Sequence, residues 1–158
     1  MSQPSTSGLP KLDWVLVANA SRARCFERDP ENGALREIAD FAHPASRMPA
    51  HELADDRPGH AFKGAASTAF DPATDPRAKE HAAFARELAA FLDESALGHR
   101  YERLAVVASN PFLGLLRAEL RGAAPLLQAS APVDLTTYTD GELERRVSAA
   151  LAESGRAS

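Results

Sequence analysis

Charged and imidazole side chains gather in one part of the chain that lacks apolar periodicity. Asp56, Arg57 and His60 lie close together there, with Pro58 and Gly59 between them. Proline presets φ and glycine accepts a positive φ, so Pro58-Gly59 is typical of a tight turn. Such a turn presents Arg57 to an RNA phosphate or to a partner. We therefore interpret Asp56, Arg57, Gly59 and His60 as RNA- or partner-binding residues. The alternative is a turn that fastens this segment to the domain through Asp56.

A second basic group is expected on one strand. Residues 22–28 alternate in such a way that Arg22, Arg24, Phe26 and Arg28 share one face. Arginines beside an aromatic ring can pair with phosphates and stack on bases, so Arg22 and Arg24 join the candidate RNA- or partner-binding residues. The alternative is an outer strand face that is solvated or covered by a helix.

Catalytic and metal chemistry has little support in the sequence. A two-metal nuclease needs clustered carboxylates, whereas the first strand has only Asp13 at its start and the fourth strand ends in Ser109-Asn110. Glu87 on the first helix is expected to be solvated. Cys25 has no His or Lys beside it in the sequence, which favours a buried thiol. No serine lies in a Gly-x-Ser-x-Gly elbow. The histidines match no standard zinc spacing: His43, His51, His60, His81 and His99. We therefore predict no catalytic residue, no metal and no cofactor.

Composition limits the class of protein. The chain has 158 residues, 44% of them hydrophobic, which suits one domain with its own core. A formal net charge of −4 argues against a general nucleic-acid or membrane-surface binder, although a local basic patch is compatible with it. One cysteine and no long apolar run predict a cytoplasmic protein without membrane contact. We expect one domain over residues 12–153, with a disordered tail at 1–11 and a frayed one at 154–158.

The elements that must position these residues follow from apolar patterning. Two short continuous apolar runs, 14–18 and 104–108, predict strands buried on both faces. An Asn-Gly turn at 32–33 joins two alternating segments into a hairpin. Strands are expected at 12–18, 22–28, 35–41, 104–108 and, as an edge strand because of Pro132, at 126–134. Helices are expected from Asp75-Pro76 to about residue 96, from Pro111 to Gly122, and from Thr139 onward.

This order predicts an α/β fold, β-β-β-α-β-α-β-α, with a mixed sheet of about five strands and helices on both faces. By analogy of element order we expect a ribonuclease-H-like arrangement. Residues 42–76 remain as a connection far longer than the usual 4–6 residues. Connections of this length in a compact domain usually carry function, so residues 42–76 become the candidate working part.

Several segments resemble a known bacterial family in their order and spacing. They are Trp14-Val15-Leu16-Val17-Ala18-Asn19, Ser21-Arg22-Ala23-Arg24, Glu52-Leu53, Asp56-Arg57-Pro58-Gly59, Phe84-Ala85-Arg86-Glu87-Leu88, Leu104 to Leu116, Asp134-Leu135-Thr136 and Glu142-Leu143-Glu144-Arg145-Arg146. The family is the one named for "protein required for attachment to host cells". The resemblance covers nearly the whole chain after Pro10.

That family is similar in fold to the central domain of archaeal and eukaryotic class-1 translation release factors. Those domains carry a Gly-Gly-Gln loop before their first long helix, and residues 42–76 hold the same position here. The corresponding stretch, residues 62–70, has one glycine and no glutamine. The resemblance therefore implies a position for the working part, and the sequence departs from the motif that performs peptidyl-tRNA hydrolysis.

Three functional hypotheses follow. The first is a non-enzymatic binding module that acts on the ribosome or on structured RNA through residues 42–76. The second is a protein-interaction factor needed indirectly for attachment to host cells. The third is a hydrolase of peptidyl-tRNA or RNA, which requires measurable turnover of one of these substrates. The oligomeric state is left open by the sequence.

Overall fold

The computed structural model of the chain describes residues 13–47 and 75–157. Five strands, three α-helices and two short 3-10 helices make up these ranges. In chain order they are β1 (Asp13–Ala18), β2 (Arg22–Arg28), β3 (Leu35–Ala42), η1 (Pro44–Arg47), α4 (Pro76–Leu97), β4 (Arg103–Ala108), α5 (Phe112–Glu119), η3 (Ala124–Leu126), β5 (Leu127–Ala131) and α6 (Asp140–Ala157).

The strands form a single mixed sheet in the order β3-β2-β1-β4-β5. The pairs β1–β2 and β2–β3 are antiparallel, whereas β1–β4 and β4–β5 are parallel. An antiparallel meander thus continues into parallel strands that are connected through helices. The α/β class, the element order and the five-strand mixed sheet predicted from the sequence are confirmed, and they form the ribonuclease-H-like arrangement.

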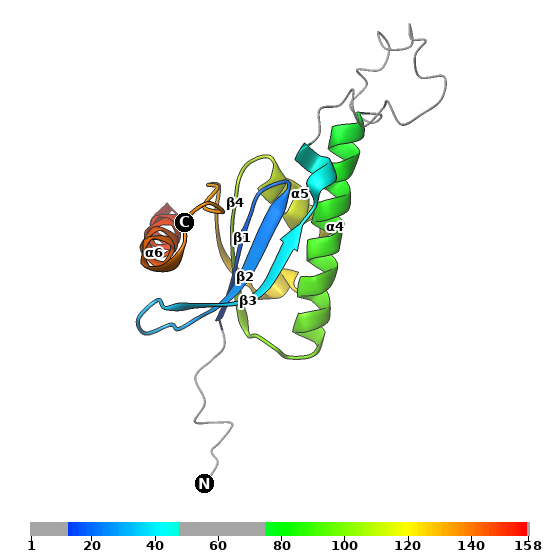
Figure 1. Cartoon of the computed structure of the whole chain (residues 1–158). Helices are drawn as coiled ribbons and strands as arrows, with labels where there is room; N and C mark the ends of the chain where they lie inside the picture. The colour runs from blue at the N-terminus through cyan, green and yellow to red at the C-terminus, as the bar shows by residue number, and fades with distance from the viewer. Residues whose placement is uncertain (1–12, 48–74, 158) are drawn as a thin grey trace, which may run out of the picture.

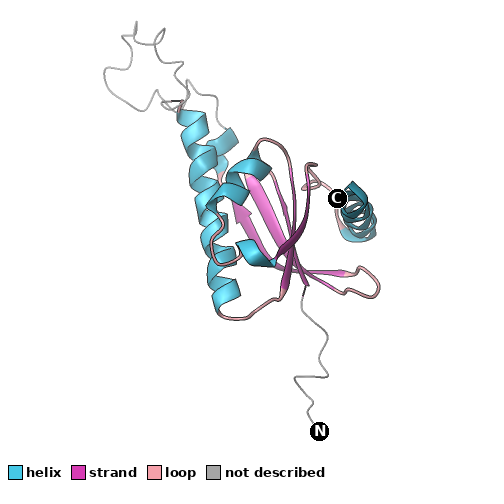
Figure 2. Cartoon of the chain, turned by 180° about the vertical axis from the view of Figure 1, so that it is seen from behind, coloured by secondary structure: helices cyan, strands magenta, loops and turns pink. Residues whose placement is uncertain are grey.

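Helices cover both faces of the sheet, as predicted. α4 and α5 lie on one face and α6 crosses the other (Figures 1 and 2). The larger apolar cluster, on the α4 side, includes Trp14, Leu16, Phe84, Leu88 and Phe112. The smaller cluster, on the α6 side, includes Val15, Val17, Phe26, Leu143 and Val147. Successive side chains of a strand point to opposite faces, so the apolar run of β1 supplies both clusters.

Local sequence signals set most element boundaries. Asp75 caps α4 by accepting a hydrogen bond from the Arg77 backbone N–H at 3.0 Å, and Pro76 occupies the first turn. Gly33, with a φ of 78°, closes the turn between β2 and β3. β5 lies at an edge of the sheet, as predicted, but it ends at Ala131, just before Pro132, and does not continue to residue 134.

Two further boundaries differ from the sequence-based expectations. α5 ends at Glu119, before Gly122, because Leu120 takes an extended backbone conformation. α6 continues to Ala157, four residues beyond Glu153, where the helix was expected to end. The start of α6 is as predicted, but its Glu142 carboxylate accepts hydrogen bonds from Arg145 and Arg146. The Thr-x-x-Glu spacing of a capping box thus predicted where the helix begins, but it did not predict the contacts of Glu142.

Candidate binding site at the carboxyl edge of the sheet

One edge of the sheet collects the ends of several strands. β1, β4 and β5 are parallel, and β3 runs in the same direction because both β1 and β3 are antiparallel to β2. We call the edge where these four strands end the carboxyl edge. η1, which follows β3, and the start of α4 also lie at this edge (Figure 1). In open α/β sheets, ligands bind outside the carboxyl ends of the strands.

Asn19, the first residue after β1, connects two parts of the carboxyl edge. Its Oδ1 accepts hydrogen bonds from the backbone N–H groups of Ser21 and Arg22, each at 2.9 Å. Its Nδ2 donates to Asp134 Oδ2 at 3.0 Å and to Thr136 Oγ1 at 3.1 Å. The amide therefore ties the β1–β2 turn to the connection between β5 and α6, across the end of β4.

Asp134 completes this cluster. Its Oδ1 accepts hydrogen bonds from the backbone N–H and the hydroxyl of Thr136, at 2.9 and 2.7 Å. Partial burial by itself would raise the pKa of Asp134, but the hydrogen bonds from Asn19 and Thr136 outweigh it and hold the pKa below its usual value. The carboxylate is therefore ionised at neutral pH and acts as an acceptor.

The depressed pKa of Asp134 predicts a pH-dependent stability. Its contribution is fully present above the unfolded value of 3.8 and is lost as the pH falls through the lower folded value. We expect Asp134→Asn to lower the free energy of unfolding by about 1 kcal/mol at pH 7, because the carboxylate is exposed and screened. Urea unfolding of both proteins from pH 7 to pH 3 measures this, and the two curves should converge at acid pH. A difference that is independent of pH would contradict the assignment.

His43 fastens the two chain segments that flank residues 48–74. Its backbone N–H donates to Ser21 O at 2.8 Å, which docks the end of β3 on the β1–β2 turn. Its Nε2 lies 2.7 Å from Glu80 Oε1 on α4, and its Nδ1 lies 3.9 Å from Glu87 Oε1. The ring also stacks on Phe84, with 5.3 Å between the ring centroids. Both ring nitrogens thus face carboxylates of α4, and we call His43, Glu80 and Glu87 the base clamp.

A histidine held by a carboxylate is also the arrangement of many general bases. In the base clamp the imidazole is about one-fifth exposed, and it is bonded on one side and stacked on the other. These contacts hold the end of β3 against α4. The base clamp is therefore suited to holding together the two ends of the connection that runs from β3 to α4.

Arg24, one of the predicted binding residues, is buried under the start of the α6 region. Its Nη2 donates to Glu37 Oε1 at 2.9 Å, and its Nη1 donates to the Tyr138 carbonyl oxygen at 2.9 Å. Its guanidinium also lies over the Phe26 ring, 5.0 Å from the centroid. The side chain is only 10% exposed, so this face of β2 is covered, which was the alternative considered for it. The contacts of Arg24 are those of a structural residue.

Arg22, the other predicted residue on β2, lies at the carboxyl edge and is 40% exposed. Its Nε is 3.7 Å from Asp40 Oδ1, an open surface ion pair. The remaining predicted residues, Asp56, Arg57, Gly59 and His60, lie outside the described residues. Arg22 therefore lies next to Asn19 at the carboxyl edge, where its backbone N–H donates to Asn19 Oδ1, and it is exposed whereas Arg24 is buried.

The cysteine is buried in the α4-side cluster, as its sequence surroundings indicated. Burial raises the pKa of Cys25 to about 12, and the positive charge of Arg100 offsets only part of this effect. The thiol is therefore protonated and unreactive at neutral pH.

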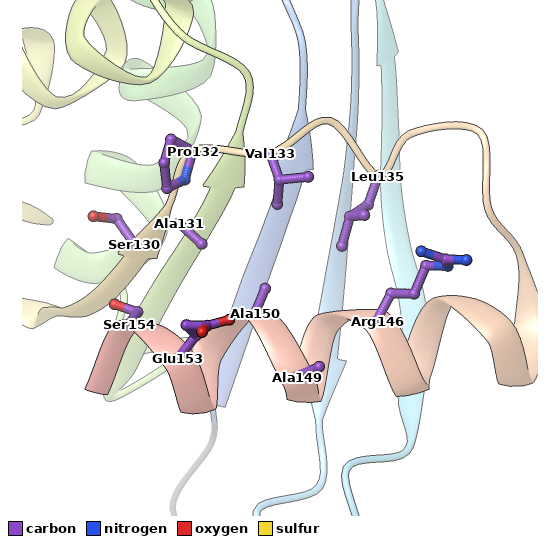
Figure 3. Close-up of a pocket in the computed structure, with 10 residues that line it drawn as sticks. All are labelled: Ser130, Ala131, Pro132, Val133, Leu135, Arg146, Ala149, Ala150, Glu153 and Ser154. Atoms are coloured by element: carbon purple, nitrogen blue, oxygen red, sulfur yellow. The ribbon is translucent and has the colours of Figure 1, made fainter. Parts of the chain in front are cut away.

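An apolar cavity of about 510 Å³ lies between β5 and α6 (Figure 3). Val133 and Leu135, in the connection after β5, point toward α6, where Ala149 and Ala150 provide small side chains. The volume lies in the range of small-molecule sites, about 300–1,000 Å³. Arg146 also lines this cavity, but its Nε donates to Glu142 and its guanidinium lies over Tyr138. Because its lining is largely apolar, this cavity is a second candidate binding site, in addition to the carboxyl edge.

Two contacts of the carboxyl edge were not predicted from the sequence. Asn19 and Asp134 each follow a strand of the parallel set, and parallel strands end at one edge, so their proximity could have been inferred. The Asp-x-Thr spacing of Asp134 and Thr136 is a further local signal for a side-chain turn. His43 and Glu80 are 37 residues apart and have no pattern that connects them.

Within 13–47 and 75–157, no group of three or more His, Cys, Asp or Glu side chains is placed to hold a metal ion. Every helix in these ranges lacks the length or the apolar character needed to cross a bilayer.

Comparison with known proteins gives one family. The model of the family "Protein required for attachment to host cells" matches residues 14–147, which is nearly the whole described fold. A search of curated proteins finds no match. The matched range includes Asn19, Asp134, the base clamp and the connection 42–76, so the family relation extends over the entire carboxyl edge. The chain belongs to the family of proteins required for attachment to host cells.

Proposed function

We propose that this protein is a non-enzymatic binding module that uses the connection 42–76 to bind the ribosome or structured RNA. The observation that carries the proposal is the base clamp. His43 lies just after β3 and Glu80 lies early in α4, and their side chains meet at 2.7 Å. A long connection whose flanking segments are fixed to a rigid core is the usual design of a binding loop.

The surroundings of the base clamp support the same use. Arg22 is exposed at the carboxyl edge and forms only a long ion pair with Asp40, so it is accessible to a phosphate. Asn19 and Asp134 hold the β1–β2 turn that carries Arg22. Because these hydrogen bonds fix the β1–β2 turn, Arg22 stays at the carboxyl edge, where the connection 42–76 begins.

Deletion of residues 48–74, with a short Gly-Ser linker in their place, tests the proposal. We expect co-sedimentation with ribosomes to be lost and the melting temperature to change little, because the described core and the base clamp are retained. Arg57→Ala should weaken binding and reduce its salt dependence by about one phosphate contact. Arg145→Ala, which removes an exposed arginine of α6, is the matched control. Ribosome binding that survives the deletion would contradict the proposal.

A second candidate is a protein-interaction factor needed for attachment. Two observations favour it. Arg24 is buried against Glu37, which removes one of the two predicted β2 contacts from the surface, and the net charge of −4 does not favour a polyanion. The apolar cavity beside Val133 suits a protein partner. Affinity capture with the intact protein and with the deletion variant separates the candidates, because recovery of ribosomal components alone would exclude this one.

A further inference from the structure

A cavity of about 210 Å³ lies at the edge opposite the carboxyl edge. We call it the amino-edge cavity, because its lining comes from the starts of β1, β4 and β5, from the end of β2 and from α6. Arg28, Arg103 and Asp13 provide its charged groups. Val15 and Leu151 belong to its apolar wall. The proposed function does not involve this cavity.

Arg28 has an incomplete set of partners. Its Nη2 donates to the Ser148 hydroxyl at 3.2 Å. Its Nε is buried and has no hydrogen-bond partner, and no carboxylate of the described residues pairs with it. Arg24, on the same strand face, has the partner that a buried arginine usually has, because the Glu37 carboxylate pairs with it. Protein atoms cover Nε, so a ligand in the cavity can meet only the Nη donors, of which Nη2 alone has a partner among the described residues.

The other charged groups of the cavity favour an anion. Arg103 Nε donates to Asp13 Oδ1 at 2.7 Å, so these two side chains neutralise each other. The positive charge of Arg28 remains. One uncompensated positive charge matches a monovalent anion, and the guanidinium fork fits a carboxylate through two N–H donors.

The apolar wall narrows the chemical class further. Leu151 and Ala129 are partly exposed and offer aliphatic surface to this cavity, which Arg28 also lines. The volume is below the range of about 300–1,000 Å³ that is typical of drug-sized ligands. We propose that the amino-edge cavity binds a small aliphatic carboxylate, whose carboxylate pairs with Arg28 and whose alkyl chain contacts Ala129 and Leu151.

Trp14 provides a fluorescence readout, and NMR chemical shifts of the cavity residues provide a second one. It is the single tryptophan of the chain and it lines the amino-edge cavity, although its indole stacks on Tyr101 on the α4 side. Fluorescence titrations use sodium acetate, butyrate and hexanoate, and inorganic phosphate at matched ionic strength. We expect saturable binding of hexanoate, with affinity rising about fourfold for each buried methylene from acetate upward. Phosphate should bind more weakly than butyrate, because it has no alkyl chain to bury.

Variants locate the site. Arg28→Gln should weaken hexanoate binding by about tenfold to one hundredfold. Arg145→Gln, an exposed arginine on the first half of α6, should leave it unchanged. Ala129→Leu keeps Arg28 and fills part of the cavity, so it should reduce hexanoate affinity more than acetate affinity. This second variant tests the alkyl site even where Arg28→Gln fails to fold.

Three results would overturn the proposal. One is the absence of a saturable hexanoate signal in both tryptophan fluorescence and NMR chemical shifts. Another is hexanoate affinity that neither Arg28→Gln nor Ala129→Leu reduces. The third is phosphate affinity equal to that of hexanoate, which would indicate a general anion site. Ribosome binding is unaffected by these variants if the two sites are independent, so failure here is distinguishable from failure of the proposed function.

Discussion

Replacement of Arg24 by alanine is expected to lower the free energy of unfolding by about 3 kcal/mol. The substitution leaves the Glu37 carboxylate and the Tyr138 carbonyl oxygen without their donor. It also removes the cation over the Phe26 ring. Loss of one partner of a buried ion pair costs about 3–5 kcal/mol, and the lower end applies because the Glu37 side chain is 36% exposed. Urea unfolding followed by circular dichroism measures the change.

Arg22→Ala is the matched control for Arg24→Ala. Both substitutions remove an arginine from the same face of β2, but Arg22 forms only an exposed pair with Asp40. We expect less than about 0.5 kcal/mol for Arg22→Ala. If Arg24→Ala instead left stability unchanged and weakened RNA binding, Arg24 would be a contact residue, as the sequence pattern first indicated. A double-mutant cycle with Glu37→Gln isolates the pairwise energy.

Asn19→Ala is expected to lower the free energy of unfolding by about 2 kcal/mol. The amide accepts hydrogen bonds from the Ser21 and Arg22 backbone and donates to Asp134 and Thr136. Each bond contributes about 1 kcal/mol in isolation, but they share one side chain, and water can replace those at the surface. Amide hydrogen exchange should quicken at residues 21 and 22 and be unchanged in the middle of α4. Unaltered exchange at the β1–β2 turn would contradict the assigned role.

A conservative variant at position 19 separates the effect of side-chain shape from the effect of charge on stability. Asn19→Asp keeps an acceptor for the Arg22 N–H but places a second carboxylate against Asp134. Like charges repel, so the variant should be less stable than wild type at pH 7, and the difference should shrink as the pH falls and one carboxylate is protonated. A loss of stability that is equal at pH 7 and pH 4 would indicate that packing, and not charge, is responsible.

These two residues connect the fold to the proposed function. Arg24 holds β2 to the segment before α6, and Asn19 holds the β1–β2 turn to the segment after β5. The backbone of that same turn, at Ser21, receives the His43 N–H of the base clamp. Loss of Asn19 should therefore also disturb the base of the connection 42–76, and ribosome binding by Asn19→Ala is expected to be weaker than that by the control variant Arg145→Ala.

Local patterns in the sequence were sufficient to predict most of the fold. The apolar runs in β1 and β4 required burial on both faces, and the structure places helices on both sides. Asp75-Pro76 predicted the start of α4 to the residue. The Asn-Gly turn predicted the β2–β3 hairpin. These features depend on residues that are close together in the sequence, so apolar periodicity and turn residues are sufficient to predict them.

The chain of this host-attachment family member thus determined its elements, their order and the alternating faces of its strands by itself. Only the tertiary structure decided the roles of individual polar side chains. Arg22 and Arg24 are equivalent in the strand pattern, yet one is exposed at the carboxyl edge and the other is buried against Glu37. Arg28, on the same face, lines a cavity and has no carboxylate partner within residues 13–47 and 75–157. Whether a side chain on this face of β2 is buried depends on α6 and the segment before it, which follow far along the chain. The local spacing of residues in β2 does not encode these long-range contacts.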